Sequence, residues 1–296
     1  MSESHNHAHG DGQFNRAFAV GVGLNLAFVG IEAWYGWSTD SLSLLADAGH
    51  NLSDVAGLVL AWGAMLVSRL KPDFRHTYGW SRAGILAAFV NAVLLLVAMG
   101  SLCLEAFQRL HSPEPVQGKI IMAVASVGIV INGLTALLFM KGRHEDLNLQ
   151  GAFVHMAADA LVSVGVVVSG AMSLYLGWDW IDPVMSIGIA IVIVLGSIGL
   201  LKQSVHLLFD AVPENVDLIS VREFLKSQDG VMQVLDLHIW AMSTTQIAMT
   251  AHLLMREGSG GDSFISKTSQ ELHTRFGIDH LTLQLMNSSV GLTCAQ

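Results

Sequence analysis

Two histidine–aspartate pairs with one spacing stand inside apolar stretches of the chain. They are His50 with Asp54 and His155 with Asp159, and each pair is four residues apart. An α-helix brings such residues onto one face, about 6 Å apart along its axis, so each pair offers an imidazole and a carboxylate in one direction. Two such faces turned toward each other would supply two nitrogens and two carboxylate oxygens. Zn²⁺ accepts that set as a tetrahedron.

The position of these pairs matters more than their spacing, because the spacing also occurs elsewhere. Further matches are His7 with Asp11 and His206 with Asp210. Ionisable groups in the middle of a bilayer-length apolar stretch are costly, and they mark functional sites. The alternative is that they are buried polar groups that hold helices together by hydrogen bonds. Asparagines expected to act in this way are Asn25, Asn91 and Asn132.

The composition is typical of a polytopic membrane protein. Hydrophobic residues make up 52% of the chain and charged residues 13%, and with a formal net charge of -9 no basic region suggests nucleic acid binding. Six apolar stretches are each long enough to cross a hydrocarbon core of roughly 30 Å. They are about 14–37, 41–66, 83–107, 120–139, 152–176 and 183–201.

The distribution of Lys and Arg predicts that both termini are cytoplasmic. Short cytoplasmic loops carry the excess of these residues, and here they concentrate in the second-to-third and fourth-to-fifth connections. The second and fifth spans would then run antiparallel, with their polar pairs at matching depth. This predicts His50 beside Asp159 and Asp54 beside His155. Asp47, one turn before His50, is expected to support the ligands or contact a helix rather than to bind metal directly.

The remaining third of the chain has the alternation of a soluble domain. Its pattern predicts a helix, two strands, a helix and a strand, which is a small α+β domain of ferredoxin-like or metallochaperone-like type. The expected elements are 217–228 with Asn215 or Asp217 as the cap, 231–242, 246–256, 262–276 and 280–286. We therefore expect a His-containing disordered tail at 1–13, a six-helix α-helical membrane domain at 14–209 and a cytosolic domain at 210–296.

Several chemistries are disfavoured by what the sequence lacks. It has no His-Glu-x-x-His run of a metalloprotease and no phosphate-binding Gly-x-x-x-x-Gly-Lys loop. Two cysteines, Cys103 and Cys294, are too few for a thiolate zinc site. A catalytic zinc keeps one position open for water, whereas four protein ligands fill a tetrahedron. The pattern indicates a site that holds and releases an ion, in a protein that is not an enzyme.

The chain resembles a known family, the cation diffusion facilitators, which are zinc-exporting transporters with six spans and a cytosolic domain. The motifs that carry the resemblance are SLLADAGHNLSD at 43–54 and HMAAD at 155–159. The resemblance implies a homodimer that exports cytosolic Zn²⁺ in exchange for protons, with His50, Asp54, His155 and Asp159 as the transport ligands. It also implies that His at the first of these positions favours zinc over cadmium.

The resemblance suggests further sites with less complete matches. A charge contact at the cytoplasmic ends of the third and sixth spans, proposed as a dimer hinge, corresponds to Arg82 and Asp210. A regulatory zinc site on the cytosolic strands corresponds to His238 and His252, although Gln284 and Met286 replace the His and Asp of some relatives. A loop site corresponds to Asp73 and His76. The short loop at 142–149 is typical of bacterial members of the family. This implies that the protein lies in the plasma membrane.

Three functions remain open from the sequence: a metal/proton antiporter, a passive divalent-metal channel, and a membrane metal sensor. Zinc binding needs neutral imidazole and ionised carboxylate, so protons compete with the metal and a proton gradient can drive exchange. The sequence leaves open the proton stoichiometry and the full metal range.

Overall fold

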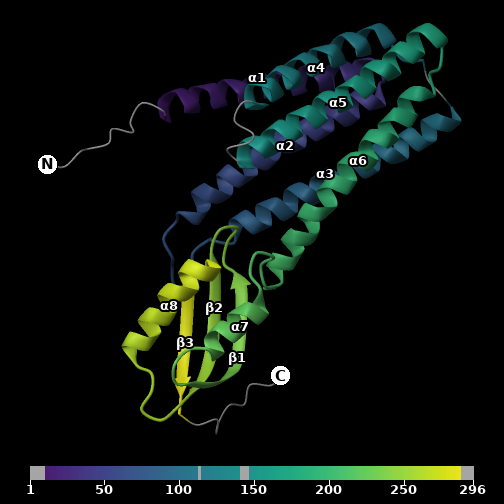
Figure 1. Ribbon diagram of the computed structural model, residues 1–296. Coiled ribbons are helices and arrows are strands. Elements are labelled where there is room, and N and C mark those ends of the chain that lie inside the picture. Colours follow the sequence, from purple (N-terminus) through teal and green to yellow (C-terminus); the bar gives the residue numbers. More distant parts are fainter. Residues whose placement is uncertain (1–10, 113–114, 141–146, 288–296) are drawn as a thin grey trace. The chain divides into compact units, whose positions relative to one another are not determined.

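The computed structural model describes residues 11–112, 115–140 and 147–287, and within α1, α2, α4 and α5 some side chains, including that of His155, lie outside the described part. Six long helices come first in the chain (Figure 1). They are α1 (Asp11–Ser38), α2 (Leu42–Ser68), α3 (Ala83–His111), α4 (Gly118–Met140), α5 (Leu147–Leu176) and α6 (Ile181–Leu208). The expected tail at 1–13 differs from this in part, because α1 begins at Asp11.

Four segments in the described part are long and apolar enough, by length and composition, to cross a membrane. They are Ala83–His111, Gly118–Leu137, Met156–Leu176 and Ile181–Leu208. α2 is of similar length and apolar character to α3, but some of its side chains lie outside the described part. Of α1, many side chains lie outside the described part.

The chain divides into two compact units, and the divisions fall within α2, α3 and α6. One comprises residues 1–59 and 91–199, and we call it the helical unit. The other comprises residues 60–90 and 200–296, and we call it the sheet unit.

The core of the helical unit is built from small and aliphatic side chains. Buried members include Leu44 and Ala46 of α2, Met99 of α3 and Val166 of α5. α4 and α5 pack closely, because a Cβ atom on Gly118 would lie only 2.3 Å from a backbone oxygen of α5. Glycine is therefore required at this crossing, which fixes α5 against its neighbour.

A buried carboxylate anchors the start of α2. Asp182, in the first turn of α6, is 1% exposed, and its Oδ2 accepts a hydrogen bond of 2.7 Å from the backbone N–H of Leu42. The hydroxyls of Ser41 and Ser43 donate to its Oδ1 at 2.9 and 2.5 Å. The negative charge lies at the positive end of the α2 dipole, which favours it. This contact sets the position of α2 two turns before His50.

The sheet unit contains the α+β fold that the sequence pattern predicts. Its elements are α7 (Leu218–Lys226), β1 (Val231–Ala241), β2 (Ile247–Met255), α8 (Asp262–Phe276) and β3 (His280–Met286). The strand order is β1-β2-β3, with β1 antiparallel and β3 parallel to β2. Alternate residues of β2, such as Met249 and Leu253, pack with Leu225 of α7 and Leu272 of α8 in one hydrophobic core. The predicted element order is confirmed.

Asp217 caps α7, as the sequence suggests. Its carboxylate accepts hydrogen bonds from the hydroxyl of Ser220 and from the backbone N–H groups of Ile219 and Ser220. These bonds, the Ser220 hydroxyl first, hold the pKa of Asp217 below its ordinary value of 3.8. The cap therefore stabilises the folded state fully above that ordinary value, and its contribution is lost as the pH falls through the lowered folded pKa.

We expect Asp217→Ala to speed amide exchange in residues 218–226 of the full chain at neutral pH, because two backbone donors lose their acceptor. The difference from the wild type should shrink as the pH falls below the ordinary carboxyl range. Asp217→Asn is the matched control, since its amide oxygen keeps the cap but does not titrate. Equal exchange in the Ala variant and the wild type at neutral pH would contradict this role.

Candidate metal centre

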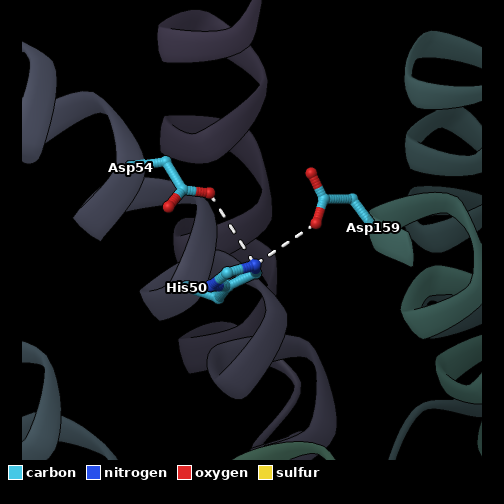
Figure 2. Close-up of side chains that lie close together, drawn as sticks. All are labelled: His50, Asp54 and Asp159. Carbon is cyan, nitrogen blue, oxygen red and sulfur yellow. Dashed lines mark hydrogen bonds and ion pairs between the residues drawn. The ribbon is translucent and has the colours of Figure 1, made fainter. Parts of the chain in front are cut away.

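Three of the four sequence-predicted ligands meet inside the helical unit. His50 and Asp54 come from α2 and Asp159 from α5, and their ligand atoms all lie within 4.8 Å of one another. The Nε2 of His50 lies 3.2 Å from Oδ1 of Asp159 and 3.7 Å from Oδ2 of Asp54 (Figure 2). The predicted placement of His50 beside Asp159 is thus confirmed. In the part of the chain that the structure describes, this is the one group of three such residues.

The local helix geometry explains why these side chains converge. His50 and Asp54 are one turn apart on α2, so they share a face, and Figure 2 shows both directed toward the carboxylate on α5. The side chain of Asp159 is 3% exposed, that of His50 18% and that of Asp54 37%. The group is therefore closed on the α5 side and more open at Asp54, which suits an ion that enters and leaves.

The fourth predicted ligand, His155, is described only through its place on α5. It lies one turn before Asp159 and so shares its helix face. Its side chain lies outside the described part of the chain, and the predicted meeting of His155 with Asp54 stays a prediction.

The ligand chemistry of the group matches a borderline divalent cation. An imidazole nitrogen and carboxylate oxygens are both zinc ligands, at about 2.0–2.2 Å from the metal. Two carboxylates also neutralise the charge of one divalent ion, which lowers the cost of holding it in a low-dielectric site.

Asp47 lies outside this group and belongs to a buried polar cluster next to it. Its Oδ2 accepts a hydrogen bond of 2.9 Å from the hydroxyl of Ser163, one turn beyond Asp159 on α5. The side-chain amide of Asn51 donates to Oε2 of Glu32 at 3.2 Å. Glu32 is a residue that the sequence reasoning missed. Its signal was present, because an acidic residue inside an apolar stretch is unusual.

Asp73 and His76 form a compact turn between α2 and α3 in the sheet unit. Oδ1 of Asp73 accepts from the backbone N–H groups of Arg75 and His76, and Nδ1 of His76 lies 3.2 Å from both carboxylate oxygens. The backbone N–H of His76 contributes most to lowering the pKa of Asp73. These two residues are adjacent as expected, but no third His, Cys, Asp or Glu among the described residues joins them.

His238 and His252 lie on neighbouring strands, β1 and β2. Nε2 of His238 is 2.9 Å from Oδ1 of Asp236, and Asp236 is the strand partner of His252. On the other side of His252 the partner in β3 is Gln284. The described residues of this sheet form no group of three that meets the metal-site geometry. The regulatory site therefore stays a prediction.

The predicted charge contact between Arg82 and Asp210 is confirmed as an ion pair. Both side chains are about half exposed, so the pair contributes about 0–1 kcal/mol to stability. They line an open hollow of about 690 Å³ together with Leu237, His238 and Trp240. Its role as a dimer hinge stays a prediction.

An apolar helical unit that brings an imidazole and two carboxylates together, followed by an α+β fold, defines a multi-pass membrane protein with a candidate internal cation site. Family models describe both parts. The model of the cation efflux transmembrane domain matches residues 18–209, and that of the cytoplasmic domain of cation efflux proteins matches residues 213–286. The chain belongs to the cation efflux family, which confirms the resemblance to cation diffusion facilitators and supports the fold class expected from the sequence.

Curated bacterial relatives are similar over nearly the full chain. The zinc transporter ZitB of Escherichia coli is 33% identical over 96% of this chain and 92% of its own length. The cadmium, cobalt and zinc/H(+)-K(+) antiporter of Bacillus subtilis is 31% identical over 94% of this chain and 91% of its own. The metal cation efflux system protein CzcD of Cupriavidus metallidurans is 31% identical over 96% of this chain and 90% of its own.

Proposed function

We propose that this chain is a secondary transporter that exports Zn²⁺ from the cytosol in exchange for protons, by alternating access. The observation that carries the proposal is the convergence of His50, Asp54 and Asp159 from two helices of the helical unit. The names of the relatives support the substrate and the proton exchange. His155 completes the ligand set in this proposal.

Protons and metal compete for the same atoms. Zn²⁺ binds neutral imidazole and ionised carboxylate, so metal binding at His50, Asp54 and Asp159 releases protons, and acid on the outer side displaces the metal. Histidine titrates in the physiological range, which makes His50 suited to this exchange. The gradient of protons then drives zinc outward, and no phosphoryl transfer or other enzymatic step is needed.

The setting of the transporter follows from the same proposal. It is placed in the bacterial plasma membrane with both termini in the cytoplasm, which is supported by the excess of Lys and Arg in residues 69–82 and 141–143. It acts as a homodimer, with the Arg82–Asp210 pair at its hinge. A regulatory Zn²⁺ at His238 and His252 is a further part of the proposal, supported by the Asp236 carboxylate 2.9 Å from His238.

Proteoliposomes test this function against the two alternatives. With the purified wild-type protein, an imposed pH gradient is expected to move Zn²⁺ against its concentration gradient, and dissipating the pH gradient should stop that movement. A passive channel would give only downhill flux, and a sensor would give none. Cd²⁺ and Co²⁺ measured in parallel report the metal range, and His50 leads us to expect slower Cd²⁺ transport.

A further inference from the structure

A second pair of acidic residues, distinct from the candidate ligands, lies buried in the helical unit. Glu32 of α1 and Asp47 of α2 are both 0% exposed. Their carboxyl groups are neighbours, because the side-chain amide of Asn51 donates to both. The amide of Asn51 lies 3.2 Å from Oε2 of Glu32 and 3.5 Å from Oδ1 of Asp47. Three helices meet in this cluster, because Ser163 of α5 also donates to Asp47.

Two fully buried carboxyl groups joined by one amide donor favour a state with at least one proton between them, since two carboxylates repel each other and each is costly to bury. No lysine or arginine in the described residues forms an ion pair with either group. α4, which also packs against α1, has Lys119 as its charged residue, and that side chain is exposed. The other titratable groups nearby are His50 and Asp159, which act electrostatically on Asp47.

The contacts indicate which group holds the proton. Asp47 accepts hydrogen bonds from Ser163 and Asn51, and such donors favour an ionised carboxylate. Oε1 of Glu32 has no hydrogen-bond partner among the described residues, although it is fully buried. An ionised Glu32 would be poorly stabilised there. These contacts favour the proton on Glu32 and the negative charge on Asp47.

The cluster is joined directly to the helix segments that carry the candidate ligands. Asp47 lies one turn before His50, and Asn51 follows His50 in the chain. Ser163 lies one turn after Asp159. A change in the protonation of Glu32 therefore alters the contact of α1 with α2, next to the bond from Ser163 to Asp47 that ties α2 to α5.

We propose that Glu32 and Asp47 form a proton-carrying pair of the exchange cycle, in addition to the protons exchanged at the metal ligands. This inference rests on the proposed antiport function. When Zn²⁺ binds beside Asp47, its positive charge stabilises a second carboxylate, and the Glu32 proton leaves to water. After the metal has left on the opposite side, Glu32 takes up a proton from water there, and the pair again carries a single negative charge.

Glu32→Gln tests the pair, because the amide keeps the shape of the side chain but cannot release a proton. In proteoliposomes we expect uptake driven by a pH gradient to fall by about tenfold or more, while exchange of labelled for unlabelled Zn²⁺ at equal pH continues near the wild-type rate. The pH profile of the remaining uptake should flatten. Ser186→Ala is the matched control: Ser186 is also buried and polar in the helical unit, has no hydrogen-bond partner in the described part, and should leave all three measurements unchanged.

The outcomes separate this inference from the proposed function. Absence of proton-driven transport in the wild type would defeat the function itself. Wild-type coupling in Glu32→Gln, with the same pH profile, would overturn only the proton-carrying pair. Infrared difference spectroscopy of the wild type adds a test that needs no active variant: a protonated carboxyl band at neutral pH that disappears on Zn²⁺ binding supports the pair, and no such band overturns it. Loss of that band in Asp47→Asn or Glu32→Gln assigns it.

Discussion

Replacing Asp159 by Asn is expected to lower zinc affinity at the central site by at least about 100-fold and to abolish proton-driven zinc transport. The Asp159 side chain is 3% exposed and lies 3.2 Å from the imidazole of His50, so it is the most enclosed of the three placed ligands. The amide that replaces it has the same size but no charge, and it leaves one carboxylate to neutralise a divalent ion. The loss of affinity and transport should reflect weaker ion binding rather than a disturbed fold, because Asn can still hydrogen-bond to His50.

Equilibrium zinc binding in detergent and uphill transport in proteoliposomes measure the two effects. Asp40→Asn is the control with the same chemical change outside the site. Asp40 has a left-handed backbone with φ of 52°, which Asn adopts readily, and its backbone oxygen accepts a 2.5 Å hydrogen bond from Arg109. Its exposed carboxylate lies 3.8 Å from the same guanidinium, a surface pair worth about 0–1 kcal/mol, so the substitution should cost little. Uphill zinc movement by Asp159→Asn at the wild-type rate would refute the ligand assignment.

The second large effect is expected at Asp182, where Asp182→Ala should destabilise the helical unit by about 3–5 kcal/mol. The substitution leaves the hydroxyls of Ser41 and Ser43 and the N–H of Leu42 buried without their shared acceptor. It also removes a negative charge from the start of α2. Asp182→Asn keeps an acceptor oxygen but no charge, and an intermediate loss is expected for it.

Thermal or denaturant unfolding in detergent, followed together with zinc affinity, tests this role. Ser186→Ala, one turn later on the same helix, removes a buried hydroxyl without a partner in the described residues and should change stability little. The start of α2 positions His50, so we also expect Asp182→Ala to weaken zinc binding in the protein that remains folded. An Ala variant as stable as Ser186→Ala would show that Asp182 does not anchor α2.

Local sequence patterns predicted the α+β fold closely. α8 and β3 have the predicted bounds, Asp262–Phe276 and His280–Met286. β1 and β2 each end within one residue of the prediction. These elements are specified by features within a few residues: a capping aspartate before α7, a glycine at the end of α8, and strands rich in apolar and β-branched residues.

The buried polar contacts were predicted only in part. The pairing of His50 with Asp159 followed from helix depth and from the direction of the spans, and the Arg82–Asp210 contact followed from family resemblance. By contrast, Glu32 and Asp182 were not singled out, although both are acidic residues in or at the ends of apolar stretches. Their importance depends on which helix faces them, and hydropathy does not report that.

By itself the sequence determined the helices, the order of the α+β elements, and the fact that His50 shares a face with Asp54 and His155 with Asp159. Those features depend on neighbours within one or two turns. Only the tertiary structure decided that Asn51 joins Glu32 to Asp47 and that Asp182 caps α2. Helices surrounded by lipid are apolar on most faces, so periodicity says little about which face meets which, and close packing and buried hydrogen bonds make that choice.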